Sequence, residues 1–301
     1  MASKQKILSV ISLLSGALVW GLMWYPYRAL YGMGVGGEMS TLLSYSMAMV
    51  FGLILLGPIW REVGNFGWAG VGLMISAGWT NLGYVLAMLD GEVMRVLLLF
   101  YLAPLWTVLL SYYLLNEKLN RYGYGIIALS LGGAFVILWD THNGLSLPQN
   151  SSEWIGLSAG MSFALMNVMV RRTQGLSIAF KAANIWLGTI LFTATLLLYQ
   201  GGIMDQLRDV TPSAWGLLWL VGLVLCSSSF ILQYGLTNLP ANQAIVLFLS
   251  ELVFAAASSY LLVDEDMGLR EIIGAMLIVL ASLLSGKCTT NPDVPFVEKD
   301  R

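Results

Sequence analysis

One carboxylate stands alone in a long apolar stretch of the sequence. Residues 241–263 carry a single charged side chain, Glu251. A helix of this length can cross the hydrocarbon of a bilayer, which takes about 20 apolar residues. A carboxylate at that depth is costly and usually serves an ion, a proton or a substrate. Glu251 is therefore a candidate for binding a cationic group or for coupling transport to a proton; the alternative is a protonated carboxyl that hydrogen-bonds a neighbouring helix.

Aromatic and amide side chains inside other apolar stretches complete the candidate set. Aromatic faces attract cations, and buried amides are costly unless they meet polar partners. The further candidates for substrate contact are Trp20, Trp24, Trp79, Asn81, Tyr84, Tyr101, Phe163, Asn167, Gln233 and Phe248. For each of them the alternative is helix packing or contact with lipid. Pro26 and Pro104 are candidates for kinks that gate access, because proline removes a helical hydrogen bond.

The sequence indicates no other chemistry. It contains no nucleotide-binding glycine loop, no Cys/His cluster with metal-ligand spacing and no paired catalytic carboxylates. No basic patch points to nucleic acid. We expect no cofactor, no metal and no enzymatic activity.

Composition places these candidates in a polytopic membrane protein. The chain has 301 residues, of which 57% are hydrophobic and 11% charged, whereas soluble domains carry about 25% charged residues. Only helices and closed barrels span bilayers. Stretches such as residues 185–199 are apolar throughout, without the period-two alternation of barrel strands.

The sequence therefore predicts an all-α protein with ten transmembrane helices. The expected spans are 7–27, 41–59, 68–89, 96–115, 122–139, 154–170, 182–199, 215–236, 242–263 and 272–285. Trp and Tyr recur at their ends, as in an interfacial aromatic belt.

Lysine and arginine predict the orientation. With a cytoplasmic N-terminus, eleven of these residues fall on the cytoplasmic side: Lys4, Lys6, Arg61, Lys118, Arg121, Arg171, Arg172, Lys181, Lys287, Lys299 and Arg301. The other four are Arg28, Arg95, Arg208 and Arg270. The excess predicts that both termini are cytoplasmic, in an inner or plasma membrane.

The two halves of the sequence resemble each other. At an offset of 148, six of the 21 positions in 97–117 are identical to their counterparts, including Phe100 with Phe248 and Glu117 with Glu265. Five spans per half place the halves in opposite orientations. We expect a first repeat at 1–140, a second at 153–286 and a cytoplasmic tail at 287–301. Inverted repeats are typical of transporters whose access alternates around a site near the midplane.

These repeated stretches resemble a known transporter motif. Residues 100–117 and 248–265 are similar to the two copies of the EamA motif of the drug/metabolite transporter superfamily, with Pro104 and Glu117 in the first copy. The second copy departs from the motif, because Leu252 follows Glu251 where a proline is usual. The resemblance implies a ten-helix carrier of small metabolites, amino-acid exporters among its relatives, with a central cavity lined by helices 1, 3, 4, 6, 8 and 9.

We expect a secondary transporter that moves a small amphipathic metabolite, an amino acid or an organic cation, by alternating access and in the direction of export. Its partners would be that small molecule and the lipid bilayer, and it would be a monomer or a homodimer. A receptor or assembly factor without transport, and an intramembrane enzyme, are the alternatives. Exchange of nucleotide sugars or phosphorylated sugars ranks lower, because their phosphates would need Lys or Arg in the cavity and we expect no well-buried Lys or Arg within the spans.

Overall fold

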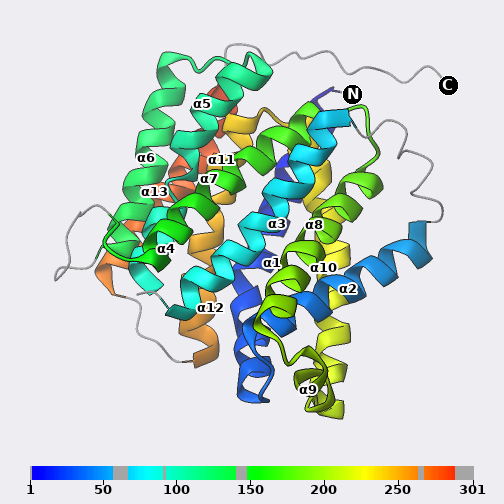
Figure 1. The fold of residues 1–301 in the computed structure, drawn as a ribbon. Helices are drawn as coiled ribbons and strands as arrows, with labels where there is room; N and C mark the ends of the chain where they lie inside the picture. The colour runs from blue at the N-terminus through cyan, green and yellow to red at the C-terminus, as the bar shows by residue number, and fades with distance from the viewer. Residues whose placement is uncertain (1, 57–66, 91–92, 140–147, 264–267, 289–301) are drawn as a thin grey trace.

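The computed structural model describes residues 2–56, 67–90, 93–139, 148–263 and 268–288, and these residues form helices without β-strands (Figure 1). The first half contains α1 (Ala2–Gly32), α2 (Gly37–Leu56), α3 (Gly67–Asp90), α4 (Val93–Phe100), α5 (Ala103–Leu115) and α6 (Arg121–Leu138). The second half contains α7 (Ser151–Arg172), α8 (Ile178–Gln200), α9 (Ile203–Arg208), α10 (Pro212–Asn238), α11 (Ala241–Phe248), α12 (Ser250–Val263) and α13 (Leu269–Leu284). A short 3₁₀ turn, η2 (Ser285–Lys287), follows.

This architecture confirms an all-α, polytopic membrane protein. In the described part of the chain, eight segments are long and apolar enough to cross a membrane, and the shorter apolar segments Ala103–Leu115 and Ile272–Lys287 accompany them. Each of the ten predicted spans overlaps a helix or a pair of helices. The short α9, between α8 and α10, was not predicted.

Polar residues begin several of these helices. The side chains of Asn120, Asn150, Ser177 and Thr211 accept hydrogen bonds from backbone amides in the first turns of α6, α7, α8 and α10. Such caps satisfy amide groups that have no partner within the helix. The helices α7, α8 and α10 therefore start three or four residues before the apolar stretches that predicted them.

Two of the predicted spans are each split into two helices. The fourth span consists of α4 and α5, with residues 101–102 between them, and the ninth consists of α11 and α12, with Leu249 between them. Pro104 explains the first break, because its nitrogen has no hydrogen to donate to the carbonyl of Phe100 four residues earlier.

The second break has no such marker in the sequence. At the position equivalent to Pro104, the amide of Leu252 donates to the carbonyl of Leu249, three residues earlier, at 3.1 Å. This bond closes a tighter turn than the α-helix makes. The other candidate for a kink, Pro26, lies within α1, which is assigned as one helix from Ala2 to Gly32.

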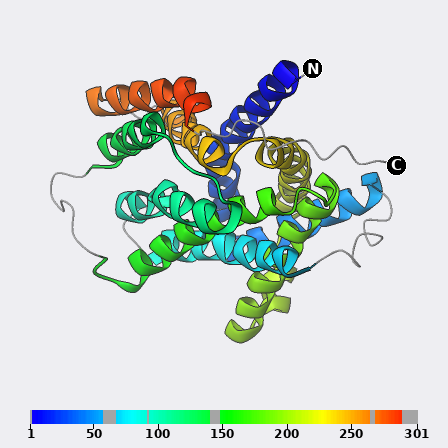
Figure 2. The ribbon, with the colours of Figure 1, turned by 90° about the horizontal axis from the view of Figure 1, so that it is seen from above.

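The helices pack in a pattern that repeats when the two halves are exchanged. Helix α7 packs against α3, α4 and α5, and its counterpart α1 packs against α10, α11 and α12. Helix α3 packs against α8, as α10 packs against α2. Two further contacts join equivalent helices of the two halves, α2 with α8 and α6 with α13. Figure 2 shows α6 and α13 side by side. The repeat boundaries at 140 and 153 stay a prediction, and most of the tail at 287–301 lies outside the described residues.

Glycines allow the closest of these contacts. A Cβ on Gly160 of α7 would lie 2.3 Å from the carbonyl oxygen of Phe100, at the end of α4. A Cβ on Gly21 of α1 would lie 2.8 Å from the carbonyl oxygen of Glu251 in α12. Each contact is with backbone, which cannot move aside as a flexible side chain could. Helix α7 therefore packs closely against the chain just before the first break, and helix α1 packs closely just after the second break.

We predict that Gly160→Ala destabilises the protein by about 1–3 kcal/mol, the usual cost of overpacking a close contact. Gly132→Ala in α6 is the matched control, because its Cβ would meet nothing within 4 Å and alanine favours a helix by about 1 kcal/mol over glycine. Thermal denaturation of the two purified variants in detergent measures the difference. Equal midpoints would show that the approach of α7 to α4 is not tight.

Candidate functional site

A cluster of aromatic rings fills the space where the two broken spans meet. The ring centroid of Phe163 in α7 lies 5.5 Å from that of Phe100 and 5.2 Å from that of Phe248. Phe100 is the last residue of α4, and Phe248 is the last residue of α11. Because these two residues are equivalent in the repeat, Phe163 sits between the matching ends of the two halves.

Two tyrosines extend this cluster toward Glu251. The ring centroids of Tyr84 and Tyr101 lie 5.3 and 5.4 Å from that of Phe100. Both hydroxyls are close enough to Glu251 for electrostatic interaction, and the Tyr101 hydroxyl also forms a side-chain hydrogen bond with its carboxyl group. We call Tyr84, Phe100, Tyr101, Phe163 and Phe248 the central cluster.

The local backbone suits a carboxylate at this point. Glu251 is half-buried and lies in the first turn of α12. The amide groups at a helix N-terminus favour negative charge, and this N-terminus exists only because the ninth span is broken at Leu249. Helix α1 packs closely against the same turn at Gly21. A carboxylate held beside aromatic rings can bind an ammonium or another organic cation, through ionic attraction and cation–π contacts.

Six of the predicted site residues are brought into the central cluster or placed next to it: Tyr84, Tyr101, Phe163, Phe248 and Glu251 by the contacts above, and Asn167 one helical turn from Phe163. Phe100 was missed by sequence reasoning. Its identity with Phe248 in the repeat was the signal that could have identified it.

The other predicted residues lie in contacts between helices. The indole of Trp24 donates to Ser258 of α12 at 2.9 Å, and that of Trp79 donates to Ser158 of α7 at 3.1 Å. Asn81 accepts from Tyr45 of α2 and donates to Thr189 of α8, both at 2.9 Å. These hydrogen bonds use the polar groups of Trp24, Trp79 and Asn81 to join neighbouring helices. Helix packing was the alternative to substrate contact for each of these residues. Trp20 is half-buried and packs against the core.

Two predicted amides are buried deeply. The side chain of Asn167 is 1% exposed and that of Gln233 is 3% exposed. Both polar atoms of the Asn167 amide, and the Oε1 atom of Gln233, have no hydrogen-bond partner in the structure.

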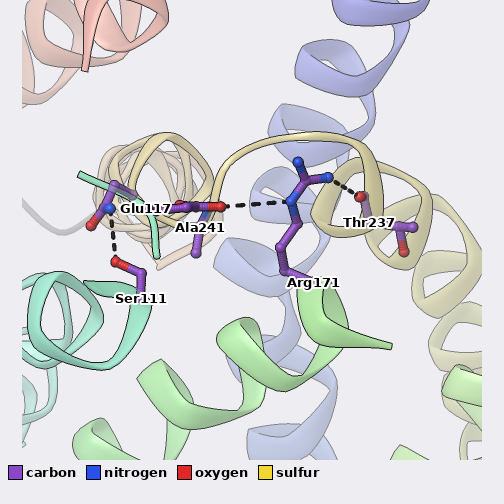
Figure 3. Close-up of polar contacts among 6 residues, drawn as sticks. Ser111, Glu117, Arg171, Thr237 and Ala241 are labelled. Atoms are coloured by element: carbon purple, nitrogen blue, oxygen red, sulfur yellow. Dashed lines mark hydrogen bonds and ion pairs between the residues drawn. The ribbon is translucent and has the colours of Figure 1, made fainter. Parts of the chain in front are cut away.

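A buried ion pair joins the two halves at the end of the bundle where α1 begins (Figures 1 and 3). Glu117, just after α5, has its Oε1 atom 3.6 Å from the Nε atom of Arg171, and the two side chains are 9% and 8% exposed. Its Oε2 atom accepts the backbone amide of Ala241, the first residue of α11, at 2.9 Å. Arg171 also donates to the carbonyl of Thr237 at the end of α10. Figure 3 shows these contacts together.

Neighbouring polar contacts reinforce this junction. The side chain of Asn242 donates to Ser111 of α5 at 2.8 Å, and Lys181 of α8 donates to the Thr237 hydroxyl at 2.9 Å. Burial raises the pKa of the Glu117 carboxyl, and Arg171 and the amides of α11 act in the opposite direction. The counterpart in the repeat, Glu265, lies outside the described residues.

This junction corrects one expectation from the sequence. Lys181 is fully buried and Arg171 nearly so, whereas no well-buried Lys or Arg was expected within the spans. Both lie just outside the predicted spans 154–170 and 182–199, in terminal turns by which helices α7 and α8 extend beyond those spans. Arg171 is paired with Glu117, so its charge is already partly balanced within the chain.

The residues available for other ligands are few. Within the described ranges no three His, Cys, Asp or Glu side chains are grouped to hold a metal ion. One apolar hollow lies along α13 and another lies between α1, α8 and α10. Neither is lined by the central cluster, and both are open apolar surfaces of the kind that lipid covers.

Comparisons with known proteins identify the family of the chain and relatives named as transporters. A model of the EamA-like transporter family matches residues 7–139 and 151–286. The chain is 26% identical to an uncharacterized transporter of Archaeoglobus fulgidus, over 83% of this chain and 88% of that protein. It is 29% identical to the uncharacterized transporter YojE of Bacillus subtilis, over 58% of this chain and 55% of that protein.

A solved crystal structure of another protein shares the fold. Its TM-score is 0.72 at 17% identity, and the match covers 92% of this chain and 96% of that one.

We predict that Glu117→Gln destabilises the protein by about 3 kcal/mol, because it leaves the buried Arg171 without its partner. Arg171→Met should destabilise for the matching reason, and the double variant should recover part of the loss. Thermal denaturation of the three variants in detergent gives the coupling energy. Asp205→Asn is the control, because Asp205 and Arg208 form an ion pair at 3.9 Å that is largely exposed and such pairs add little. Additive effects of Glu117→Gln and Arg171→Met would contradict the pairing.

Proposed function

Because the chain belongs to the EamA-like transporter family, we propose that it is a secondary transporter of a small amphipathic metabolite, an amino acid or an organic cation. The observation that carries this proposal is the position of Glu251. The only charged side chain of residues 241–263 lies at a break in its span, beside aromatic rings supplied by both halves. An ammonium group would meet a carboxylate there, and an apolar side chain would meet aromatic rings.

The packing supports alternating access as the mechanism. The two halves make equivalent contacts, and the first segments of both broken spans, α4 and α11, end against Phe163. Breaks of this kind give a span two rigid segments that can tilt separately. The Glu117–Arg171 pair ties the halves together at the end where α1 begins. In the orientation predicted from Lys and Arg, that end is cytoplasmic, so the pair would separate when the site opens to the cytoplasm and would re-form before release outside.

The energy source follows from the same residues. The sequence has no nucleotide-binding loop, so transport would be driven by a gradient. Glu251 can release a proton when it binds a cation and regain it afterwards, because one carboxylate cannot hold both. We propose that this competition couples export to proton entry in an inner or plasma membrane.

We predict that Glu251→Gln weakens transport about ten- to a hundredfold, because a hydrogen bond to a charged group contributes about 1.5–3 kcal/mol. The measurement is uptake of radiolabelled amino acids and of radiolabelled tetraethylammonium into proteoliposomes, at several pH values. Wild-type uptake should depend on pH, and the residual uptake of the variant should not.

Asp205→Asn serves as the control, since Asp205 is exposed on α9 and should leave uptake unchanged. Unaltered uptake, affinity and pH dependence in Glu251→Gln would show that Glu251 neither binds the substrate nor couples transport.

A further inference from the structure

Asn167 differs from the other buried amides in having no partner for either polar atom. Its side chain is 1% exposed, and neither Nδ2 nor Oδ1 makes a hydrogen bond. Gln233 is similarly buried, and its Oε1 atom has no partner. Leaving a buried polar group unsatisfied costs about 1–3 kcal/mol. Native proteins rarely accept that cost unless water or a ligand meets the group.

The two amides lie on facing helices at the same depth. Arg171 in the last turn of α7 donates to the carbonyl of Thr237 in the last turn of α10. Asn167 is four residues before Arg171, and Gln233 is four residues before Thr237, so each lies one turn deeper on the same face of its helix. Helices α7 and α10 pack together and run in the same direction. The two amides therefore lie at the same depth of the bundle, in the region one turn from the Arg171–Thr237 contact.

This region lies between the central cluster and the Glu117–Arg171 pair. Phe163, Asn167 and Arg171 follow one another at four-residue steps along one face of α7, so Asn167 is midway between ring and guanidinium. Helix α11 runs from the ion pair to the central cluster, because its first residue, Ala241, donates to Glu117 and its last residue, Phe248, contacts the ring of Phe163. All of its residues are buried.

The repeat shows why Asn167 is unusual at its position. Residues 20–24 of α1 (WGLMW) align with residues 163–167 of α7 (FALMN), which pairs Asn167 with Trp24. The Trp24 indole donates to Ser258 of α12. The residue of α5 that corresponds to Ser258 is Leu110, which offers no hydrogen-bonding group. The second half therefore places an amide where the protein itself supplies no equivalent partner.

We propose that Asn167 and Gln233 form a hydrogen-bonding subsite for the transported molecule, which takes a carboxylate or carboxamide group while Glu251 takes the cationic end. The inference rests on the proposed transport function and adds a second polar contact to it. Arg171, one turn away, disfavours a second cationic group at the subsite and favours an oxygen acceptor. The ligand is then an amphipathic molecule with two different polar ends.

Cysteine labelling tests the subsite without knowledge of the substrate. Single cysteines replace Asn167, Gln233, Phe248 and Val168 in a background carrying Cys226→Ser and Cys288→Ser, and each variant is checked by size-exclusion chromatography and reconstituted in liposomes. The reagents are a sulfonate-bearing and a trimethylammonium-bearing methanethiosulfonate. Val168→Cys is the control, because Val168 is fully buried in α7 next to Asn167.

The proposal expects Asn167→Cys and Gln233→Cys to react at least ten times faster than Val168→Cys, and faster with the sulfonate than with the ammonium reagent. Gln233→Cys keeps the test valid if Asn167→Cys does not fold. Reaction at Phe248→Cys alone would overturn the subsite and leave the proposed transport function standing. Faster reaction with the ammonium reagent would overturn the carboxylate assignment, and no reaction at any position would count against both the subsite and transport through this region.

Discussion

The cost of placing a carboxylate within a membrane span is the constraint on which this structure depends. Glu251 would be unfavourable in an unbroken apolar helix, because no backbone group there is free to stabilise its charge. The break at Leu249 begins a new helix immediately before it, and the helix N-terminus, Tyr84 and Tyr101 supply polar surroundings.

A symmetric frame supports this asymmetric chemistry. Both halves break their fourth span at the same register, and both end the first segment with phenylalanine, Phe100 and Phe248, against Phe163. The residue that corresponds to Glu251 is Ala103, and the residue that corresponds to Asn167 is Trp24. The scaffold is therefore duplicated, while the carboxylate of Glu251 and the deeply buried amides of Asn167 and Gln233 come from the second half.

Sequence reasoning predicted the features that depend on local composition. Apolar length located the spans, Pro104 marked the first break, and the isolated charge identified Glu251. It could not find the break at Leu249, because no proline or glycine marks it. It also could not pair Glu117 with Arg171 or place Trp24 on Ser258, because these contacts join residues more than 50 positions apart in the chain. Their partners depend on how the helices pack.

The most direct test of the central claim, that Glu251 binds the transported molecule, is a thermal-shift screen of the purified protein against amino acids, polyamines and quaternary amines. The account predicts that at least one of these compounds, each of which carries a cationic nitrogen, raises the denaturation midpoint of the wild type and fails to raise that of Glu251→Ala. A compound that stabilises both proteins equally would show that the binding site does not include Glu251.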